Sequence, residues 1–461
     1  MDRTADALVL FGITGDLARK MTLPALYRLE ARDLLPCPVL GVGRREGGQE
    51  EIHTRAREAI EEAGESVDEA VFQRLADRLR YVAGDVTDPE LYTKIAQALG
   101  GAERPVFYLA IPPSYFGSTV EALGAADLTT GARVVIEKPF GEDLASATEL
   151  NRRIRRVLEE DQVYRIDHFL GKEPVQDIVY LRFANEIFEP IWNRYHVSTV
   201  QINMAEDFDV ADRGTFYDPV GALRDVVQNH LLQILALVTM EAPAGGHDPI
   251  ADRRLDVLRS IPDADPSAYV RGQYEGYRAV KGVRPDSETE TFAALRLEID
   301  NWRWAGVPFL IRTGKALPVT ATEVDIRFRL PPAILMGDSI GEVKRHNHMT
   351  LRIGPEPGAS LGVMVKAPGE DRPDPVHLDF SFQEQPGRAP APYERLLLDA
   401  INGDGTLFPR QEVIEETWRI LQPLLDAPPP TEHYAKGSWG PASADRLAQD
   451  HGGWRVPEGR H

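Results

Sequence analysis

The chain has 461 residues, a length at which a single hydrophobic core stops growing, so we expect two domains. Its apolar content of 43% and charged content of 27% are those of ordinary globular proteins, and no low-complexity tract suggests disorder. The formal net charge of −20 argues against a nucleic-acid partner bound through its phosphates, so an anionic ligand must meet a local cluster of cations.

The cysteine count and the apolar runs indicate a soluble cytoplasmic protein. The single cysteine, Cys37, cannot form an internal disulfide, which fits a reducing compartment. The apolar run near the start is too short for a secretory signal, and acidic residues stand on both sides of it. The longest apolar helical stretch, 231–240, is far shorter than a membrane span, so no membrane partner is expected.

Residues 1–140 alternate between short apolar runs and amphipathic segments. A helical pattern such as 23–35 has its apolar side chains on one face. The apolar runs predict strands at 7–12, 38–43, 80–85, 105–111 and 133–138. Strands of this kind that alternate with helices are typical of a doubly wound parallel sheet. We therefore expect a Rossmann-like dinucleotide-binding domain over residues 1–170.

The pattern changes after about residue 195. Several segments now alternate apolar and polar residues with a period of two, at 198–208, 292–300, 323–330 and 376–382. Such strands in succession predict an antiparallel sheet. Helices are predicted at 219–240, 393–402 and 410–426, and connections at the Pro-rich stretches 385–394 and 426–433. We expect a larger α+β domain over residues 171–461, with a mainly antiparallel sheet.

The first strand is followed by "LFGITGDLARK", in which Gly12 and Gly15 precede the first helix. A pyrophosphate binds in this context, because N–H groups at the start of the helix face the anion. Only G-x-x-G is present, and a glycine at such a turn is often turn chemistry alone. The second strand is followed by Arg44 and Arg45, where an arginine suits the 2′-phosphate of NADP and an acid suits NAD. The position favours NADP over NAD, with a solvated arginine pair as the alternative.

Residues 164–173, "YRIDHFLGKE", place Asp167, His168 and Lys172 close together after a buried strand. A solvated loop explains them, and so does a site that holds an anion and moves a proton. On the helix 219–240, His230 falls on an otherwise apolar stripe. A histidine there is more often a core residue than a catalyst. Its polar neighbours favour a general base, and Asp167 is the candidate partner that raises its basicity.

Two lysines follow strands elsewhere in the chain. Lys138 and Pro139 stand at the carboxyl end of a parallel strand, where ligands of open α/β sheets bind. Lys315 follows Gly314 just past another strand. Taken singly, either lysine is also an ordinary exposed residue. The 11 histidines are scattered without ligand spacing, so no metal site is predicted.

These motifs together resemble the glucose-6-phosphate dehydrogenase family. The resemblance rests on "GITGDLARK", "EKPFG", "YRIDHFLGKE", "RDVVQNHLLQ", "RTGKAL" and "YERLLLDAI", which occur in the family's order over nearly the whole chain. It implies oxidation of a hexose 6-phosphate, glucose 6-phosphate first of all, at C1 to a lactone. This reaction passes a hydride to NADP and opens the oxidative pentose phosphate pathway. A homodimer or homotetramer that associates through the antiparallel sheet is also implied.

The resemblance assigns roles to residues of this sequence. It implies that His230 takes the proton of the C1 hydroxyl and that Asp167 pairs with His230. The residues implied to bind substrate are His168 and Lys172 for the phosphate, with Glu206, Asp225, Lys315 and Lys138 for the remainder. The residues implied to bind the cofactor are Gly12, Ile13, Thr14, Gly15, Asp16, Leu17, Arg44, Asp85 and Lys138. A cis peptide bond before Pro139 is also implied.

Three positions depart from the family pattern. Most members have tyrosine where this chain has Phe169, many have lysine in place of Met21, and a second cation usually stands where Thr320 is found. Losing these contacts would weaken glucose 6-phosphate binding by roughly two or three orders of magnitude if nothing compensates. Two alternatives therefore stay open. One is the same chemistry on another hexose or amino-hexose phosphate, and the other is a catalytically weak binding paralogue.

Overall fold

The computed structural model describes residues 3–45, 48–245, 248–331, 346–370, 373–382 and 390–457. The chain divides into two compact units. Unit 1 comprises Met1–Glu173 and Ala389–Glu415, and unit 2 comprises Pro174–Arg388 and Glu416–His461. The contiguous second domain expected over 171–461 is therefore interrupted, because one segment near the C-terminus packs with unit 1.

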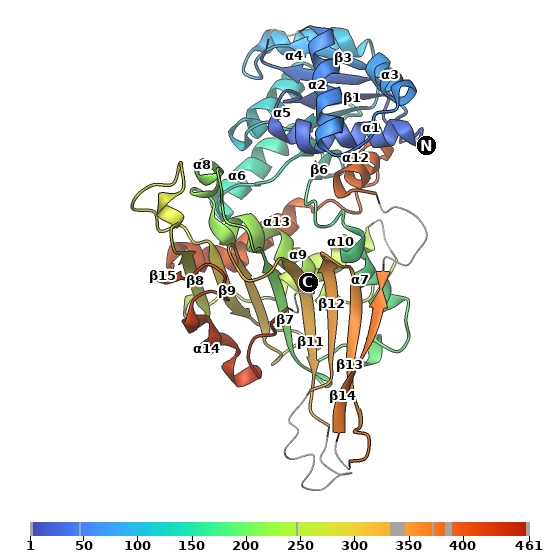
Figure 1. Cartoon of the computed structure of the whole chain (residues 1–461). Coiled ribbons are helices and arrows are strands. Elements are labelled where there is room, and N and C mark those ends of the chain that lie inside the picture. The colour runs from blue at the N-terminus through green and yellow to red at the C-terminus, as the bar shows by residue number, and fades with distance from the viewer. Residues whose placement is uncertain are drawn as a thin grey trace. The chain divides into compact units, whose positions relative to one another are not determined.

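Unit 1 contains a parallel sheet of six strands in the order β3-β2-β1-β4-β5-β6 (Figure 1). The strands are β1 (Ala7–Phe11), β2 (Val39–Gly43), β3 (Leu79–Ala83), β4 (Pro105–Leu109), β5 (Arg133–Ile136) and β6 (Val163–Arg165). Every residue of β1, β2, β4 and β5 is buried, as expected of strands covered on both faces. The predicted doubly wound sheet is confirmed, and its strand order is that of dinucleotide-binding folds.

The helices of unit 1 connect these strands. They are η1 (Ala18–Thr22, a π-helix), α1 (Leu23–Ala31), α2 (Gln49–Glu62), α3 (Glu69–Arg78), α4 (Pro89–Leu99), α5 (Phe116–Ala125), α6 (Leu144–Ile154) and α12 (Pro392–Asn402). The helix predicted over 23–35 ends four residues early. Asp33 has a φ of 54°, a left-handed conformation that terminates the helix.

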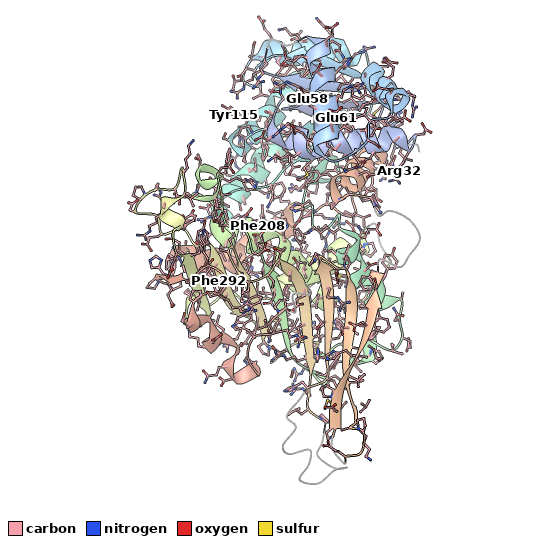
Figure 2. All side chains as sticks on the ribbon, viewed as in Figure 1. Arg32, Glu58, Glu61, Tyr115, Phe208 and Phe292 are labelled. Carbon is pink, nitrogen blue, oxygen red and sulfur yellow. The ribbon has the colours of Figure 1, made fainter. Side chains whose placement is uncertain are left out.

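Helix α12 explains why a late segment belongs to unit 1. Its apolar side chains Leu396, Leu397, Ala400 and Ile401 are buried in the core cluster that also contains β1 and α1. At its first turn Glu394 forms an ion pair with Arg32, which follows α1 and is labelled in Figure 2. The buried apolar face and this ion pair fix the segment to the dinucleotide-type unit.

Unit 2 contains a nine-stranded sheet in the order β14-β13-β12-β11-β7-β10-β9-β8-β15 (Figure 1). The strands are β7 (Val197–Ala205), β8 (Tyr269–Tyr274), β9 (Phe292–Leu297), β10 (Phe309–Gly314), β11 (Ala321–Phe328), β12 (His348–Gly354), β13 (Gly358–Lys366), β14 (Pro373–Ser381) and β15 (Thr431–Tyr434). Neighbours are antiparallel except β7 with β10 and β8 with β15. The mainly antiparallel sheet is confirmed.

The Pro-rich stretches were predicted to be connections only. That prediction is wrong for the end of 426–433, because residues from Thr431 onward pair with β8 as the edge strand β15. In the other stretch, 385–394, the residues up to 389 lie outside the described part of the chain. Helix α12 already begins at Pro392.

The helices of unit 2 include the one that carries His230. They are α7 (Glu173–Phe183), α8 (Gly214–Tyr217), η5 (Leu223–Leu231, a π-helix), α9 (Leu232–Thr239), α10 (Pro249–Arg259), α13 (Gln411–Asp426, at which unit 2 resumes) and α14 (Asp445–Ala448). Short 3₁₀ turns complete the chain at η2 (Pro113–Tyr115), η3 (Glu160–Gln162), η4 (Glu189–Ile191), η6 (Pro266–Ala268), η7 (Tyr277–Ala279), η9 (Ala442–Ala444) and η10 (Gln449–His451). Among the described residues, no helix is long and apolar enough to cross a membrane.

The helix predicted over 219–240 is present and the residues of its predicted stripe are buried, but burial extends beyond that stripe. The first part, η5, has π-helical winding, which shifts the positions of side chains around the axis. Burial extends to Gln228 and Asn229 as well as to His230, and every residue of α9 is buried. Helix α9 is enclosed on all sides, and in η5 only Arg224 and Asp225 are partly exposed, so a pattern with the α-helical period does not describe the buried face.

Candidate active-site residues

The loop after β1 has the backbone geometry of an anion cradle. Gly12 has a φ of +76°, and a Cβ there would stand 2.1 Å from the carbonyl oxygen of Ala110. The Gly15 N–H donates to the Gly12 carbonyl at 2.8 Å, which closes the turn before the helix starts at Asp16. The first N–H groups of a helix lack intrahelical partners and face an anion placed there. This loop fits a dinucleotide pyrophosphate.

Arg44 and Asp85 lie near each other beyond the ends of β2 and β3. Arg44 is exposed, and its charge contributes to lowering the pKa of Asp85. The main causes of that lowered pKa are the backbone N–H of Thr87 and the Thr87 hydroxyl, which both donate to the Asp85 carboxylate, at 2.9 and 2.7 Å. Asp85 thus fixes its own turn, while Arg44 is exposed directly after Gly43, the β2 residue that approaches Thr14 of the phosphate loop.

Beyond β5, the segment Glu137–Lys138–Pro139 carries a buried acid next to the predicted lysine. The predicted cis peptide bond before Pro139 is confirmed. Glu137 is only 5% exposed, and burial raises the pKa of its carboxyl to about 7. Its Oε1 accepts a hydrogen bond of 2.5 Å from the hydroxyl of Tyr108 on β4. Lys138 itself is partly buried.

Beyond β6, Asp167, His168 and Lys172 lie on one short segment. Asp167 is 3% exposed, and its Oδ1 accepts the Phe169 N–H at 2.9 Å. The Phe169 ring lies edge-to-face with the His168 ring, with centroids 5.1 Å apart. The Lys172 Nζ stands 3.5 Å from the centroid of the same ring, a cation–π contact. Phe169 therefore arranges the imidazole and the ammonium group around one aromatic ring.

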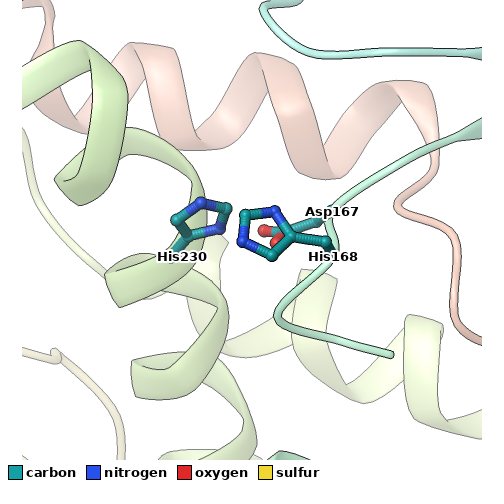
Figure 3. Close-up of side chains that lie close together, drawn as sticks. All are labelled: Asp167, His168 and His230. Carbon is teal, nitrogen blue, oxygen red and sulfur yellow. The ribbon is translucent and has the colours of Figure 1, made fainter. Parts of the chain in front are cut away.

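In unit 2, His230 is carried by η5 and is 3% exposed. Its backbone N–H donates to the Asn229 side chain at 2.6 Å, and Gln228 on the same helix donates to Thr417 at 2.9 Å. Figure 3 shows the His230 side chain on this helix, and the Asp167 and His168 side chains on the segment that follows β6.

Another group of predicted substrate residues meets at the end of β10 in unit 2. The Lys315 Nζ donates to Glu206 Oε2 at 2.5 Å. It also lies 5.0 Å from the ring of Phe208, a half-exposed side chain labelled in Figure 2, and 5.4 Å from that of Tyr217. Burial raises the pKa of Tyr217, and the nearby charge of Asp225 adds to the effect. Glu206, Asp225 and Lys315 therefore surround one buried tyrosine.

The three positions that depart from the family pattern have defined surroundings. Met21 lies in η1 and is 43% exposed. Thr320 donates to Asp207 Oδ1 at 2.5 Å and accepts the Asp207 N–H at 3.1 Å, so it fixes the residue that follows Glu206. Phe169 is buried and contacts two predicted phosphate ligands. Two of the three replacements thus have a local structural role: Thr320 hydrogen-bonds to Asp207, and the Phe169 ring contacts His168 and Lys172.

Sequence reasoning missed Glu137, Tyr217 and Tyr393. Glu137 stood in the quoted motif "EKPFG", but a glutamate at a strand end gives no sign of burial. Tyr217 precedes the His230 helix in an unremarked stretch. Tyr393 is more than two hundred residues from its neighbour His168, whose ring it stacks against with centroids 6.1 Å apart and an interplanar angle of 17°. No local pattern predicts a contact at that separation.

The chain matches two family descriptions that together span it. Residues 9–177 match the NAD binding domain of glucose-6-phosphate dehydrogenase, and residues 179–455 match the C-terminal domain of the same enzyme. A parallel six-stranded sheet with a phosphate loop, joined to a unit with a mainly antiparallel sheet, defines a two-domain dehydrogenase that uses a nicotinamide dinucleotide.

Known proteins resemble the chain over its full length. It is 52% identical to "Glucose-6-phosphate 1-dehydrogenase 1" of Mycobacterium tuberculosis, over 98% of this chain and 97% of that protein. A crystal structure of the enzyme from Mycobacterium avium, also 52% identical, superposes with a TM-score of 0.93 over 99% of this chain and all of that one. A glucose-6-phosphate dehydrogenase in complex with glucose 6-phosphate is 31% identical, with a TM-score of 0.91 and the same coverage. The chain belongs to the glucose-6-phosphate dehydrogenase family.

Proposed function

We propose that this protein oxidises glucose 6-phosphate at C1 to the 6-phospho-lactone and uses NADP as the hydride acceptor, the first step of the oxidative pentose phosphate pathway. The observation that carries the proposal is the full-length identity of 52% to glucose-6-phosphate 1-dehydrogenases, in a chain that keeps the motif residues of the family. The alternative of a purely binding paralogue loses ground, because such a module has no use for a buried base.

The phosphate loop and the arginine beyond β2 would hold the cofactor. Residues Gly12 to Leu17 supply the turn and the helix start for the pyrophosphate, and Arg44 is exposed where a 2′-phosphate would lie. When bound, the nicotinamide ring accepts the hydride that leaves C1. The exposed guanidinium favours NADP over NAD, since an acid at this position would suit the ribose hydroxyl instead.

His230 acts as the general base in this proposal, and the carboxylate of Asp167 pairs with it. The imidazole takes the proton from the C1 hydroxyl while the C1–H bond breaks, so the oxygen keeps the electron pair that forms the lactone carbonyl. An imidazole with a near-neutral pKa suits this task. A carboxylate partner raises its basicity and stabilises the imidazolium that forms.

His168 and Lys172 hold the phosphate, and the Glu206, Asp225 and Lys315 side chains contact the rest of the sugar. Fixing the dianion at one end orients C1 toward the base at the other, which lowers the entropy cost of reaction. Lys138, next to the cis proline, lies between substrate and cofactor in this proposal. The shared ring of Phe169 supports both phosphate ligands, although it lacks the hydroxyl that a tyrosine would offer there.

A second candidate keeps this chemistry and changes the sugar. The observation that favours it is Thr320, which bonds to Asp207 where the family usually has a cation. Initial rates of NADP and NAD reduction with glucose 6-phosphate, its epimers and glucosamine 6-phosphate separate the candidates. We expect the highest kcat/KM with glucose 6-phosphate and NADP. A higher kcat/KM with another hexose phosphate would show that this other sugar is the substrate. If neither cofactor is reduced with any of these sugars, the proposed dehydrogenase activity is refuted.

We also propose that the protein is a cytoplasmic homodimer or homotetramer whose copies associate through the face of the nine-stranded sheet. On β14, the side chains of Val376, Leu378 and Phe380 are 40%, 49% and 49% exposed, and they alternate with polar residues along the strand. An apolar row of this kind on a sheet face favours contact with a second copy. The single cysteine, Cys37, has no second cysteine to pair with in the chain and is buried, which fits a reducing compartment.

A further inference from the structure

We propose that helix α12 positions the phosphate-binding segment 167–172, and that Tyr393 and Glu137 together fix the orientation of the His168 imidazole. The inference rests on the proposed function, which assigns His168 to the substrate phosphate. It goes beyond that function by assigning a positioning role to groups outside the proposed set of substrate ligands: helix α12 with its Tyr393, and the buried acid Glu137.

The first turn of α12 packs directly against the phosphate-binding segment. A Cβ on Gly171 would stand 2.9 Å from the carbonyl oxygen of Pro392 and 3.0 Å from Leu396 Cγ. Only glycine lets the helix approach so closely. The helix is in turn fixed to unit 1 by the Arg32–Glu394 ion pair and by its buried apolar face. The segment therefore rests on a rigid neighbour.

Tyr393, in the same first turn, reaches the imidazole of His168. The two rings are stacked, with an interplanar angle of 17° and centroids 6.1 Å apart. Phe169 meets the imidazole edge-to-face, at an interplanar angle of 66°. Two aromatic contacts from different directions restrict the rotation of the imidazole. Such restriction should strengthen the binding of phosphate by His168, because the side chain loses less conformational freedom when the anion binds.

Glu137 anchors Tyr393. The Tyr393 hydroxyl donates to Glu137 Oε2 over a long contact of 3.5 Å, and the Tyr108 hydroxyl donates to Oε1 at 2.5 Å. A carboxyl that is 5% exposed needs such donors, because an unsatisfied acid in the interior is costly. The acid thus joins the end of β5 to the tyrosine that stacks on His168.

The rest of the returning segment holds β6, from which the phosphate-binding segment starts. The Phe408 ring packs edge-to-face on Tyr164, with centroids 4.8 Å apart. The Gln411 N–H donates to Glu160 at 2.8 Å, and Glu160 also pairs with Arg165 at 2.6 Å. The segment therefore supports both the strand and the loop that follows it, as expected if the chain returns to unit 1 to position this loop.

The test compares Tyr393→Phe, Tyr393→Leu and Glu137→Gln with the matched control Tyr27→Phe. The Tyr27 hydroxyl also bonds within unit 1, to Ser66, but far along the chain from the phosphate-binding segment. Four quantities are measured on the full-length enzyme: KM for glucose 6-phosphate, Ki for inorganic phosphate as a competitive inhibitor, KM for NADP, and Tm. A purely structural role would lower Tm without separating the two substrates.

We expect Tyr393→Leu to raise KM for glucose 6-phosphate and Ki for phosphate about tenfold, with KM for NADP within about twofold of wild type. Tyr393→Phe and Glu137→Gln should each raise the two phosphate-dependent constants about threefold, and the double variant should be no worse than Tyr393→Phe alone. Tyr27→Phe should lower Tm and leave all three constants unchanged.

The inference fails if Tyr393→Leu and Tyr393→Phe both leave the Ki for phosphate unchanged, or if the effects of Tyr393→Phe and Glu137→Gln add independently. It also fails if KM for NADP rises as much as KM for glucose 6-phosphate. The conservative Tyr393→Phe keeps the test decisive should Tyr393→Leu not fold. Failure of the proposed function is a different result, since the wild-type enzyme would then reduce no cofactor.

Discussion

His230 is the residue on which the proposed chemistry depends most. It is 3% exposed on a helix whose buried side chains also include Gln228 and Asn229. Burial of several polar groups around one imidazole costs free energy unless they serve structure or function, because each needs a hydrogen-bond partner. The predicted role of His230 as a general base would explain why polar side chains are buried around it.

Replacing His230 with asparagine should remove the base and keep a polar side chain of smaller size. We expect kcat to fall by about 10²- to 10⁴-fold, the usual contribution of a positioned general base. The Kd for NADP, measured by fluorescence titration, should stay within about twofold of wild type, because no base is needed to bind the cofactor. A kcat near the wild-type value, or an equal loss of cofactor affinity, contradicts the role.

Glu137 predicts a pH dependence of stability. Its pKa is raised to about 7 by burial, so the folded protein retains the proton that the unfolded chain loses near pH 4.5. The folded state then binds more protons than the unfolded state, and the stabilisation from protonated Glu137 is lost as pH rises from about 4.5 to about 7.

Glu137→Gln isolates this effect, because glutamine is uncharged at every pH and has no titratable proton. The difference in Tm between variant and wild type should shift in favour of the variant as pH rises from 5 to 8, by an amount equivalent to at most about 3 kcal/mol. A difference that does not change between these pH values would show that Glu137 titrates normally.

The packing of helix α12 against Gly171 leaves no room for a larger side chain at residue 171. Gly171→Ala should push the first turn of α12 away from the phosphate-binding segment, because the new Cβ meets the Pro392 carbonyl at 2.9 Å. We expect KM for glucose 6-phosphate to rise about fivefold to fiftyfold, because a small displacement of a binding side chain is costly when geometry must be exact. Gly405→Ala is the matched control, since a Cβ there meets nothing within 4 Å. Equal effects of the two substitutions would refute the packing argument.

The elements also show what the sequence could predict. The strands of unit 1 were predictable because fully buried parallel strands are continuous runs of apolar residues. Strands such as β7 were predictable because apolar and polar residues alternate along their sequence. The short edge strand β15 was not predicted, because it forms by pairing with β8, which lies far away in the chain. The π-helical winding of η5 and the return of α12 to unit 1 were missed for the same reason: tertiary packing decides them, not local periodicity.

The candidate site residues could be predicted from motifs, but the residues that pack against them could not. Lys172 and His168 stand in one short motif, while the ring that stacks on His168 comes from Tyr393. Glu206 and Lys315 are about a hundred residues apart, yet β7 and β10 are neighbours in the sheet and bring them into an ion pair. The ligand residues stand in short motifs that can be read from the sequence, whereas the residues that support them come from distant segments brought near by the fold.

For the whole molecule, the apolar row on β14 predicts self-association. Leu378→Glu places a charge in the middle of that row, which should disfavour burial against a second copy. We expect light scattering with size exclusion to show a loss of the dimer or a lower oligomer for this variant, while Asp379→Asn, on the opposite face of the strand, keeps the wild-type mass. An unchanged mass for Leu378→Glu would exclude β14 from the interface.

The proposed reaction moves a hydride from C1 of glucose 6-phosphate to NADP. Incubation with glucose 6-phosphate deuterated at C1, followed by mass spectrometry of the reduced cofactor, tests it most directly. We expect one deuterium in each NADPH formed by the wild type and almost no NADPH from His230→Asn. Unlabelled NADPH, or no NADPH from the wild type, would contradict it.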